Sequence, residues 1–233
     1  MTEQEIKLEL VRIFGTSQSS IDLCKKAYEF ITGSKELETV SPMISTKVAF
    51  AKATAIDLGL TSGTLWADRN LDAKSPEDIG KYFSWGNTKG YTPSDNPNFS
   101  DEAYDKTTGH IAQCNLFEPY DAAQKLLGDD WKMPAKWQFH ELMECCDWKW
   151  IENGKVKGYR VTGINGNSIF LPCTGYYSGR SLGNSSYGYY WSTTWSSSSS
   201  SYSLGFYSSN KYTSNYGRYY GMVVRPITHL PKH

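Results

Sequence analysis

Hydrophobic residues recur at helical spacing near the start of the chain. Four of them lie three or four residues apart and share one helix face: Ile21, Cys24, Tyr28 and Ile31. Gly15 and Gly33 follow the two apolar segments and can end a helix. The pattern predicts a helical hairpin as an appendage over residues 1–35, joined to the rest of the chain by a polar connector over residues 36–54.

The next apolar segments are short and alternate with turn residues. Residues 54–60 and 64–70 have the composition of strands. Ser75 followed by Pro76 has the pattern of a helix start. Residues 84–110 are rich in Gly, Pro, Asn and Asp, which is typical of an irregular loop.

Both helices and strands are predicted in the second half of the chain. Residues 120–128 and 134–146 have helical patterns, whereas Asn-Gly pairs at 153–154 and 165–166 indicate β-hairpin turns. In residues 201–209, Leu204 and Phe206 share one face of a strand while Ser203, Gly205 and Tyr207 share the other, with the period of two that a half-buried strand shows. We therefore expect an α+β domain over residues 55–229.

Charge is divided unevenly along the chain, although the net charge is zero. From Asn153 to His233 there is no Asp or Glu, while eight Lys and Arg residues are scattered through the segment. Nucleic-acid backbones favour clustered cations, so no nucleic-acid partner is expected. The acidic start lacks the pattern of a signal peptide, and no apolar run has the length of a membrane span, so neither export by that route nor membrane insertion is expected.

Aromatic and small polar residues dominate the C-terminal segment. Residues 174–220 contain eleven of the seventeen tyrosines and fifteen serines. Tyr and Trp offer rigid amphipathic contact area, and Ser, Gly and Asn offer adaptable hydrogen-bonding groups, as in antibody paratopes. The composition favours a recognition surface, with core packing as the better interpretation for Tyr190, Trp191 and Phe206.

Five motifs in order resemble one family. They are "DLGLTSGTLWADRNLDAKSPEDIGKYFSWGN", "DDWKMPAKWQFHEL", "GNSIFLPCTGYYSG", "GYYWSTT" and "GMVVRPI". Together they resemble the bacterial and phage C-type-lectin-like family called the major paralogous domain, which lies near the formylglycine-generating-enzyme branch. The resemblance implies a C-type-lectin-like fold. Many members resemble the variable proteins of diversity-generating retroelements, which implies a variable region over residues 175–222.

The resemblance also implies roles for individual residues. The framework would include Trp131, Met133, Pro134, Trp191, Leu204, Phe206, Val223 and Arg225. The ligand-binding positions would be Tyr177, Ser178, Asn184, Tyr187, Tyr189, Trp195, Ser196, Ser203, Gly205, Tyr207, Tyr212, Asn215, Tyr216, Tyr219 and Tyr220.

Catalytic and metal-binding alternatives find less support in the residues. The enzymatic relatives use C-terminal cysteines, and the chain has none after Cys173. His110 and His140 are candidate bases without a recognisable triad. Four acidic residues of the long loop could hold a structural calcium ion, although a solvated acidic loop is the commoner case: Asp95, Asp101, Glu102 and Asp105. We expect no catalytic residue, metal or cofactor.

The expected function is therefore non-catalytic recognition of a receptor. The partner would be a cell-surface protein or glycan, and the protein would be located in a virion or in the cytoplasm before assembly. The favoured interpretation is the diversified variable protein of a retroelement, possibly associated with a phage tail. A formylglycine-generating-type enzyme and an invariant bacterial adhesin stay open as alternatives. The apolar stripe of the appendage makes an oligomer possible.

Overall fold

The computed structural model of the protein describes residues 53–108, 114–128, 130–154 and 156–229. The chain divides into two units, Met1–Phe50 and Ala51–His233, and everything described here belongs to the second. The predicted helical hairpin over residues 1–35 and nearly all of the connector lie outside the described residues.

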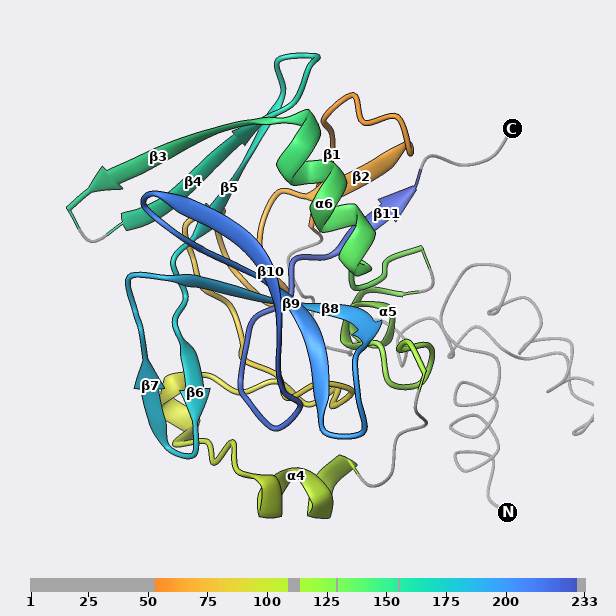
Figure 1. The fold of residues 1–233 in the computed structure, drawn as a ribbon, viewed down its shortest axis with the longest axis vertical. Helices are drawn as coiled ribbons and strands as arrows, with labels where there is room; N and C mark the ends of the chain where they lie inside the picture. Colours follow the sequence, from red (N-terminus) through yellow and green to blue (C-terminus); the bar gives the residue numbers. More distant parts are fainter. Residues whose placement is uncertain (1–52, 109–113, 129, 155, 230–233) are drawn as a thin grey trace, which may run out of the picture. The chain divides into compact units, whose positions relative to one another are not determined.

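Strands form most of the regular structure (Figure 1). The first sheet has the order β1-β2-β11 and contains β1 (Ala55–Asp57), β2 (Thr64–Ala67) and β11 (Ile227–His229). A second sheet has the order β3-β4-β5, with strands β3 (Asp147–Asn153), β4 (Val156–Thr162) and β5 (Ser168–Pro172). A two-stranded sheet pairs β6 (Tyr176–Ser178) with β7 (Ser181–Gly183).

The central sheet comes from the Tyr- and Ser-rich segment. Its order is β10-β9-β8, with strands β8 (Gly188–Trp195), β9 (Ser200–Tyr207) and β10 (Asn210–Gly217). The helices are α4 (Asp101–Thr108), α5 (Ala122–Leu127) and α6 (Lys136–Cys145), and a 3-10 turn spans Pro93–Asp95.

Both faces of the central sheet are covered, which explains why β8 is almost entirely buried. On one face, Tyr190, Leu204 and Phe206 pack in a cluster with residues of α6, β4 and β5. On the other face, Tyr189 and Trp191 pack in a second cluster with residues such as Trp85, Met133 and Met222. The alternation of side chains along a strand divides neighbouring aromatic residues between these two cores.

A buried arginine connects three parts of the fold. The Arg225 side chain is fully buried, and its guanidinium donates to the Asn70 side chain and to the backbone oxygens of Ala67 and Phe170 at 2.7–3.0 Å. Burial lowers the pKa of Arg225 to about 10. Three correctly placed oxygen acceptors replace the water that the cation loses.

The expectation of an α+β domain with a C-type-lectin-like fold is wrong. The described residues contain eleven strands but only three α-helices, of which the longest has ten residues. The helix predicted from Ser75 is a turn, in which the Asp78 amide donates to the Ser75 oxygen at 3.2 Å. Conversely, the segment predicted as loop contains α4. Good N-terminal signals do not make a helix where no apolar face follows them.

Several local predictions are confirmed. Both predicted helices after residue 120 are present as α5 and α6, and the two Asn-Gly pairs connect β3 to β4 and β4 to β5. The central framework residues are fully buried: Trp191, Leu204, Phe206, Val223 and Arg225. Of the helix-entry residues, Met133 and Pro134 are buried and Trp131 is half-buried.

Candidate recognition surface

Eight tyrosines from five segments lie together on one side of the central sheet. We call them the tyrosine cluster: Tyr176, Tyr187, Tyr189, Tyr207, Tyr212, Tyr216, Tyr219 and Tyr220. Only Tyr189 is buried, and the other seven are half-buried, so each presents part of its ring at the surface.

Ring contacts make the cluster continuous. The Tyr207 ring lies 5.0 Å from that of Tyr187, which in turn stacks on Tyr189 with 6.1 Å between ring centroids. Tyr189 lies edge-on to Tyr176 at 5.0 Å and to Tyr216 at 5.6 Å. From these two rings the contacts continue through Tyr220 to Tyr219, whose centroids are 4.4 Å apart. Mutual packing of this kind holds the rings rigid.

Strand pairing places Tyr212 in the cluster. Tyr212 pairs with Gly205 across the β9–β10 hairpin, and its ring lies directly over the glycine. A Cβ atom at residue 205 would lie 2.7 Å from Cε2 and Cζ of the tyrosine and 2.9 Å from its hydroxyl oxygen. Gly205 is therefore a buried support for the Tyr212 ring, and its own contribution to a contact surface is small.

The hydroxyl groups of the cluster lie close enough to affect one another's pKa values. The Tyr212 hydroxyl interacts with those of Tyr189 and Tyr216, and the Asn184 amide donates to the Tyr189 hydroxyl at 3.4 Å. Burial raises the pKa of Tyr189 and of Tyr212 to about 12. A hydrogen bond with Tyr220, followed by burial, raises the pKa of Tyr219 to about 12. These hydroxyls consequently stay protonated near neutral pH and can both donate and accept.

Three cations of the Tyr-rich segment differ in their surroundings. Arg180 is exposed at the turn between β6 and β7, where it donates to the Asn96 oxygen at 2.9 Å. The Arg218 side chain is buried, stacks on the Trp85 ring at 4.5 Å and donates to the Ser197 oxygen at 2.6 Å. Lys211 lies over Trp148 at 5.7 Å, on the opposite face of the sheet. The Tyr-rich segment itself contains no Asp or Glu, but Asp101 of α4 lies near enough to contribute to the raised pKa of Tyr219. The cluster therefore offers mainly aromatic area and hydroxyl groups.

Seven of the predicted binding residues belong to the cluster: Tyr187, Tyr189, Tyr207, Tyr212, Tyr216, Tyr219 and Tyr220. Ser178 and Asn184 are exposed beside it on or near β6 and β7, and Trp195 and Ser196 are half-buried at the end of β8.

Four predicted binding residues are placed elsewhere. Tyr177 is buried and packs against Tyr82 and Phe99 in the core. Ser203 is fully buried, as is Gly205 beneath its tyrosine. Asn215 is exposed, but its odd position on β10 puts its side chain on the face opposite to Tyr212 and Tyr216.

The cluster also contains one residue that the sequence interpretation missed. Tyr176 contacts Tyr189, Tyr216 and Tyr220, whereas its neighbour Tyr177 faces the core. The alternation of β6 predicts that one of the two tyrosines faces outward. Nothing in the local sequence decides which one does.

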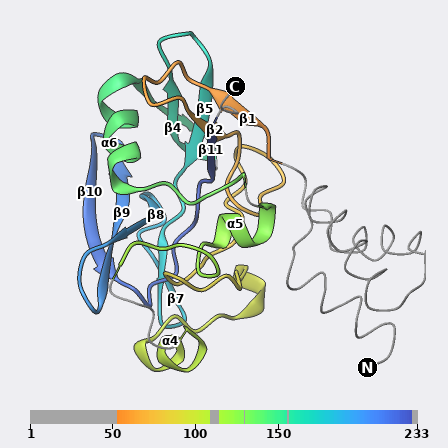
Figure 2. The ribbon, with the colours of Figure 1, turned by 90° about the vertical axis from the view of Figure 1, so that its right-hand side faces the viewer.

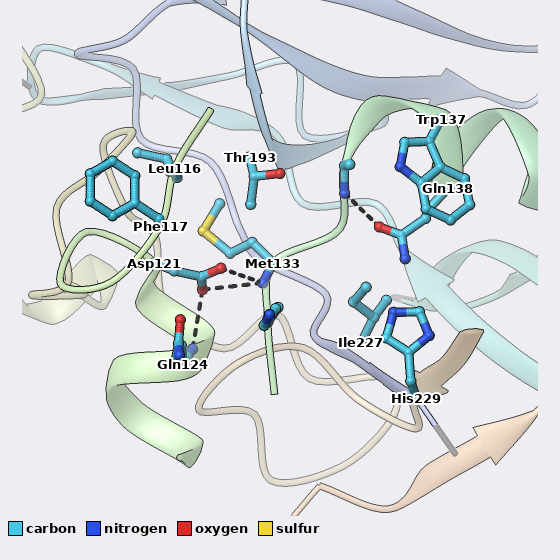
Figure 3. Close-up of a pocket in the computed structure, with 12 residues that line it drawn as sticks. Leu116, Phe117, Asp121, Gln124, Met133, Trp137, Gln138, Thr193, Ile227 and His229 are labelled. Atoms are coloured by element: carbon cyan, nitrogen blue, oxygen red, sulfur yellow. Dashed lines mark hydrogen bonds between the residues drawn. The ribbon is translucent and has the colours of Figure 1, made fainter. Parts of the chain in front are cut away.

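A separate pocket of about 230 Å³ lies between α5, α6 and β11 (Figure 3). Phe117 and Trp137 lie on opposite sides of it, with 53% and 54% of their surfaces exposed. Asp121 lines the pocket and joins the start of α5 to the segment around Met133. Its carboxylate accepts from the amides of Ala123, Gln124 and Met133 at 2.9–3.1 Å. Burial raises the pKa of Asp121.

The candidate catalytic and calcium-binding residues have structural roles where they are described. The His140 ring bonds to the Thr213 hydroxyl at 3.1 Å, and His110 lies outside the described residues. The Asp95 carboxylate accepts from the Thr92 amide at 2.6 Å, and Asp101 and Glu102 occupy the first turn of α4. Among the described residues, no three His, Cys, Asp or Glu side chains gather as a metal site.

The described cysteines differ in their exposure. Only Cys173 is buried among those described; Cys146 is half-buried and Cys114 and Cys145 are exposed. Cys24 lies outside the described residues.

Comparisons with known proteins give one partial match. Residues 140–227 match the family described as a domain of unknown function (DUF8237). This range starts in α6, ends at the first residue of β11 and contains the whole tyrosine cluster. No curated protein and no solved structure matches the chain. Within the described residues, no helix is long and apolar enough to cross a membrane.

Proposed function

We propose that the protein is a non-catalytic binding protein that recognises a cell-surface protein or glycan through the tyrosine cluster. The observation that carries this proposal is the continuous ring contact of six half-buried tyrosines with Tyr189, in a segment that contains no Asp or Glu. A surface without a binding role is ordinarily rich in charged residues.

The packing of the cluster favours binding on energetic grounds. A free tyrosine side chain loses rotamer freedom when it is immobilised at an interface, and this costs about 0.5 to 1.5 kcal/mol for each such side chain. Here contacts with neighbouring rings restrict Tyr187, Tyr216 and Tyr220 before a partner arrives. Most of the conformational entropy of these rings is therefore lost during folding, and little more is lost when a partner binds.

A narrower proposal concerns how the surface arises. Adenine-directed mutagenesis of AAC or AAT codons produces Tyr, Ser, Asn and Gly among other residues, which suits the composition of residues 177–220. We propose on this basis that the protein is the variable protein of a diversity-generating retroelement, in a phage or bacterial setting. A reverse transcriptase gene and a template repeat that differs at adenines, near the coding gene, would support it; their absence would refute this narrower proposal and leave an invariant adhesin.

Binding can be tested with a matched pair of variants. One variant carries Tyr207→Ser, Tyr219→Ser and Tyr220→Ser. The control carries Tyr202→Ser, which removes a half-buried tyrosine from the opposite face of the same sheet, where Lys136 lies over it at 3.9 Å. Both are titrated against a glycan array and against immobilised bacterial envelope fractions.

We expect the triple variant to lose at least about tenfold in affinity and the control to bind like the wild type, since central aromatic contacts dominate recognition. Because these contacts are of short range, wild-type affinity should change less than about tenfold between roughly 50 and 300 mM salt. Equal binding by both variants would refute the proposal. Retention on DNA with steep salt dependence would support a nucleic-acid partner instead.

A further inference from the structure

The outer edge of the central sheet is a long strand with an unpaired side. In the strand order β10-β9-β8, β10 is terminal, and Figure 2 shows it as the outermost strand on the left of the molecule. It has eight residues, contains no proline and pairs with β9 without a bulge. Such an edge can add a further strand, and proteins usually protect against this with prolines, bulges or several charges.

The register shows which backbone groups face outward. Tyr207 and Asn210 flank a two-residue turn, and such a pair exchanges both of its hydrogen bonds. Hydrogen-bonded pairs then recur at every second residue, and the Arg218 amide continues this series by donating to the Ser199 oxygen at 2.9 Å. The odd-numbered residues between them therefore direct their amide and carbonyl groups outward: Lys211, Thr213 and Asn215.

These outward groups have no protein partner in the described part of the chain. Neither the amides nor the carbonyl oxygens of Lys211, Thr213 and Asn215 take part in a backbone hydrogen bond outside the β9–β10 ladder. Each is a strong hydrogen-bonding group that a second strand can satisfy.

We propose that β10 pairs in antiparallel fashion with β10 of a second copy of this chain, around a two-fold axis at Thr213. In this register Thr213 lies opposite Thr213 of the partner subunit, and Lys211 lies opposite Asn215 of the partner subunit. All three hydrogen-bonded pairs are formed by outward-facing residues. This interface goes beyond the proposed recognition of a receptor and does not depend on it.

Charge and size are complementary in this register. Lys211 is the only charged residue of β10, and the two-fold axis sets it against the uncharged amide of Asn215 of the partner subunit. On the tyrosine face, Tyr212 lies opposite Ser214 of the partner subunit, so that a large side chain meets a small one. No like charges oppose one another.

The interface is closed after two copies. The opposite edge of the sheet, β8, is already bonded: the Trp191 amide donates to Val223, the Thr193 amide donates to Pro134 and the Leu116 amide donates to the Thr193 oxygen, all at 2.8–3.0 Å. A two-fold contact uses the same edge on both copies and leaves none for a third. The dimer carries two tyrosine clusters on one face of a continuous sheet, which allows bivalent binding.

The test uses the mass in solution of the full chain and three variants of Asn215, whose side chain is exposed. Sedimentation of the wild type from about 1 μM to 1 mM, the range of weak association constants, should show a rise from one chain toward two. Asn215→Asp places a carboxylate opposite Lys211 twice in the dimer and should tighten association about three- to tenfold.

Asn215→Lys sets two like-charge pairs across the same interface and should weaken association at least about tenfold, while Asn215→Ala serves as the uncharged control and should associate like the wild type. The difference between the Asp and Lys variants should shrink in about 1 M salt. A wild type that stays a single chain throughout, equal association of the Asp and Lys variants, or larger oligomers that persist in the Lys variant would each overturn the proposal.

Discussion

The contact between Gly205 and the Tyr212 ring predicts a strong energetic coupling between these two residues. A methyl group at residue 205 would lie 2.7 Å from two ring carbons of Tyr212, well inside the normal contact distance. Gly205→Ala should therefore push the ring out of place, and such overpacking typically costs about 1 to 3 kcal/mol of the free energy of unfolding.

Removal of the ring should reverse this effect. In a Tyr212→Ser background the three atoms nearest to the added methyl group are gone, and a glycine inside a strand is itself less favourable than alanine by about 0.5 to 1 kcal/mol. Gly205→Ala should then be neutral or stabilising. The difference between the two backgrounds gives a coupling free energy of about 2 kcal/mol.

Urea unfolding of the wild type, both single variants and the double variant would measure this coupling. A second glycine provides the contrast: a Cβ atom at Gly188 would lie 2.1 Å from Cζ of Phe206, which is fully buried and has no room to move. Gly188→Ala should be destabilising in both backgrounds. If Gly205→Ala costs the same with and without the Tyr212 ring, the proposed role of Gly205 as a support is wrong.

Three further predictions concern the core, the buried cation and pH. Trp191→Ala should lower the free energy of unfolding by about 3 to 5 kcal/mol, because it empties a fully buried site and leaves the Phe83 oxygen without its indole donor. Arg225→Ala should cost about 3 to 5 kcal/mol, since it strands three buried acceptors, and Arg225→Lys should recover only part of it; chemical denaturation measures both. Burial raises the pKa of Tyr189 to about 12, against an ordinary value of 10. The contribution of Tyr189 to the free energy of unfolding should therefore be constant below about pH 10 and fall toward pH 12, where the unfolded state loses the proton first. Tyr189→Phe should reduce this loss, as measured by unfolding curves at about pH 8 and about pH 11.5.

Each of these three predictions has a contradicting result. A Trp191→Ala variant that unfolds at the wild-type urea concentration would place the indole outside the core. Wild-type stability in Arg225→Lys would show that the fork of three hydrogen bonds is dispensable. Ultraviolet absorbance that titrates all tyrosines near their ordinary pKa in the folded protein would contradict the burial of the Tyr189 hydroxyl.

Local elements near polar turns could be predicted from the sequence. The Asn-Gly pairs at 153–154 and 165–166 lie where the expected hairpins turn, although Asn153 is still paired with Val156 and the β4–β5 loop spans residues 163–167. Both glycines adopt a positive φ, which a turn can require and which glycine adopts without strain. The strand predicted within residues 201–209, observed as β9, was recognisable from its own sequence, since Leu204 and Phe206 alternate with Ser203 and Gly205. Local patterns of this kind do not depend on what packs against them.

The composition of the tyrosine cluster was also visible in the sequence, but its membership was not. Alternation divides Tyr176 from Tyr177 and Asn215 from Tyr216 whatever the tertiary structure is. Which face is open depends on the segments that cover the sheet, and here both faces carry a hydrophobic cluster. Four tyrosines pack against the second hydrophobic cluster and stay half-buried: Tyr176, Tyr187, Tyr216 and Tyr220.

The sequence by itself determined the turns, two helices and the division of side chains between strand faces. Only the tertiary structure decided that the described unit is mainly β, that Tyr177 faces the core and that Gly205 supports a neighbouring ring. The physical reason is that backbone conformation follows largely from neighbours along the chain. Burial and side-chain contacts instead depend on residues that are distant in sequence, such as Phe99 against Tyr177. The local sequence pattern does not show which distant residue will pack against a given side chain.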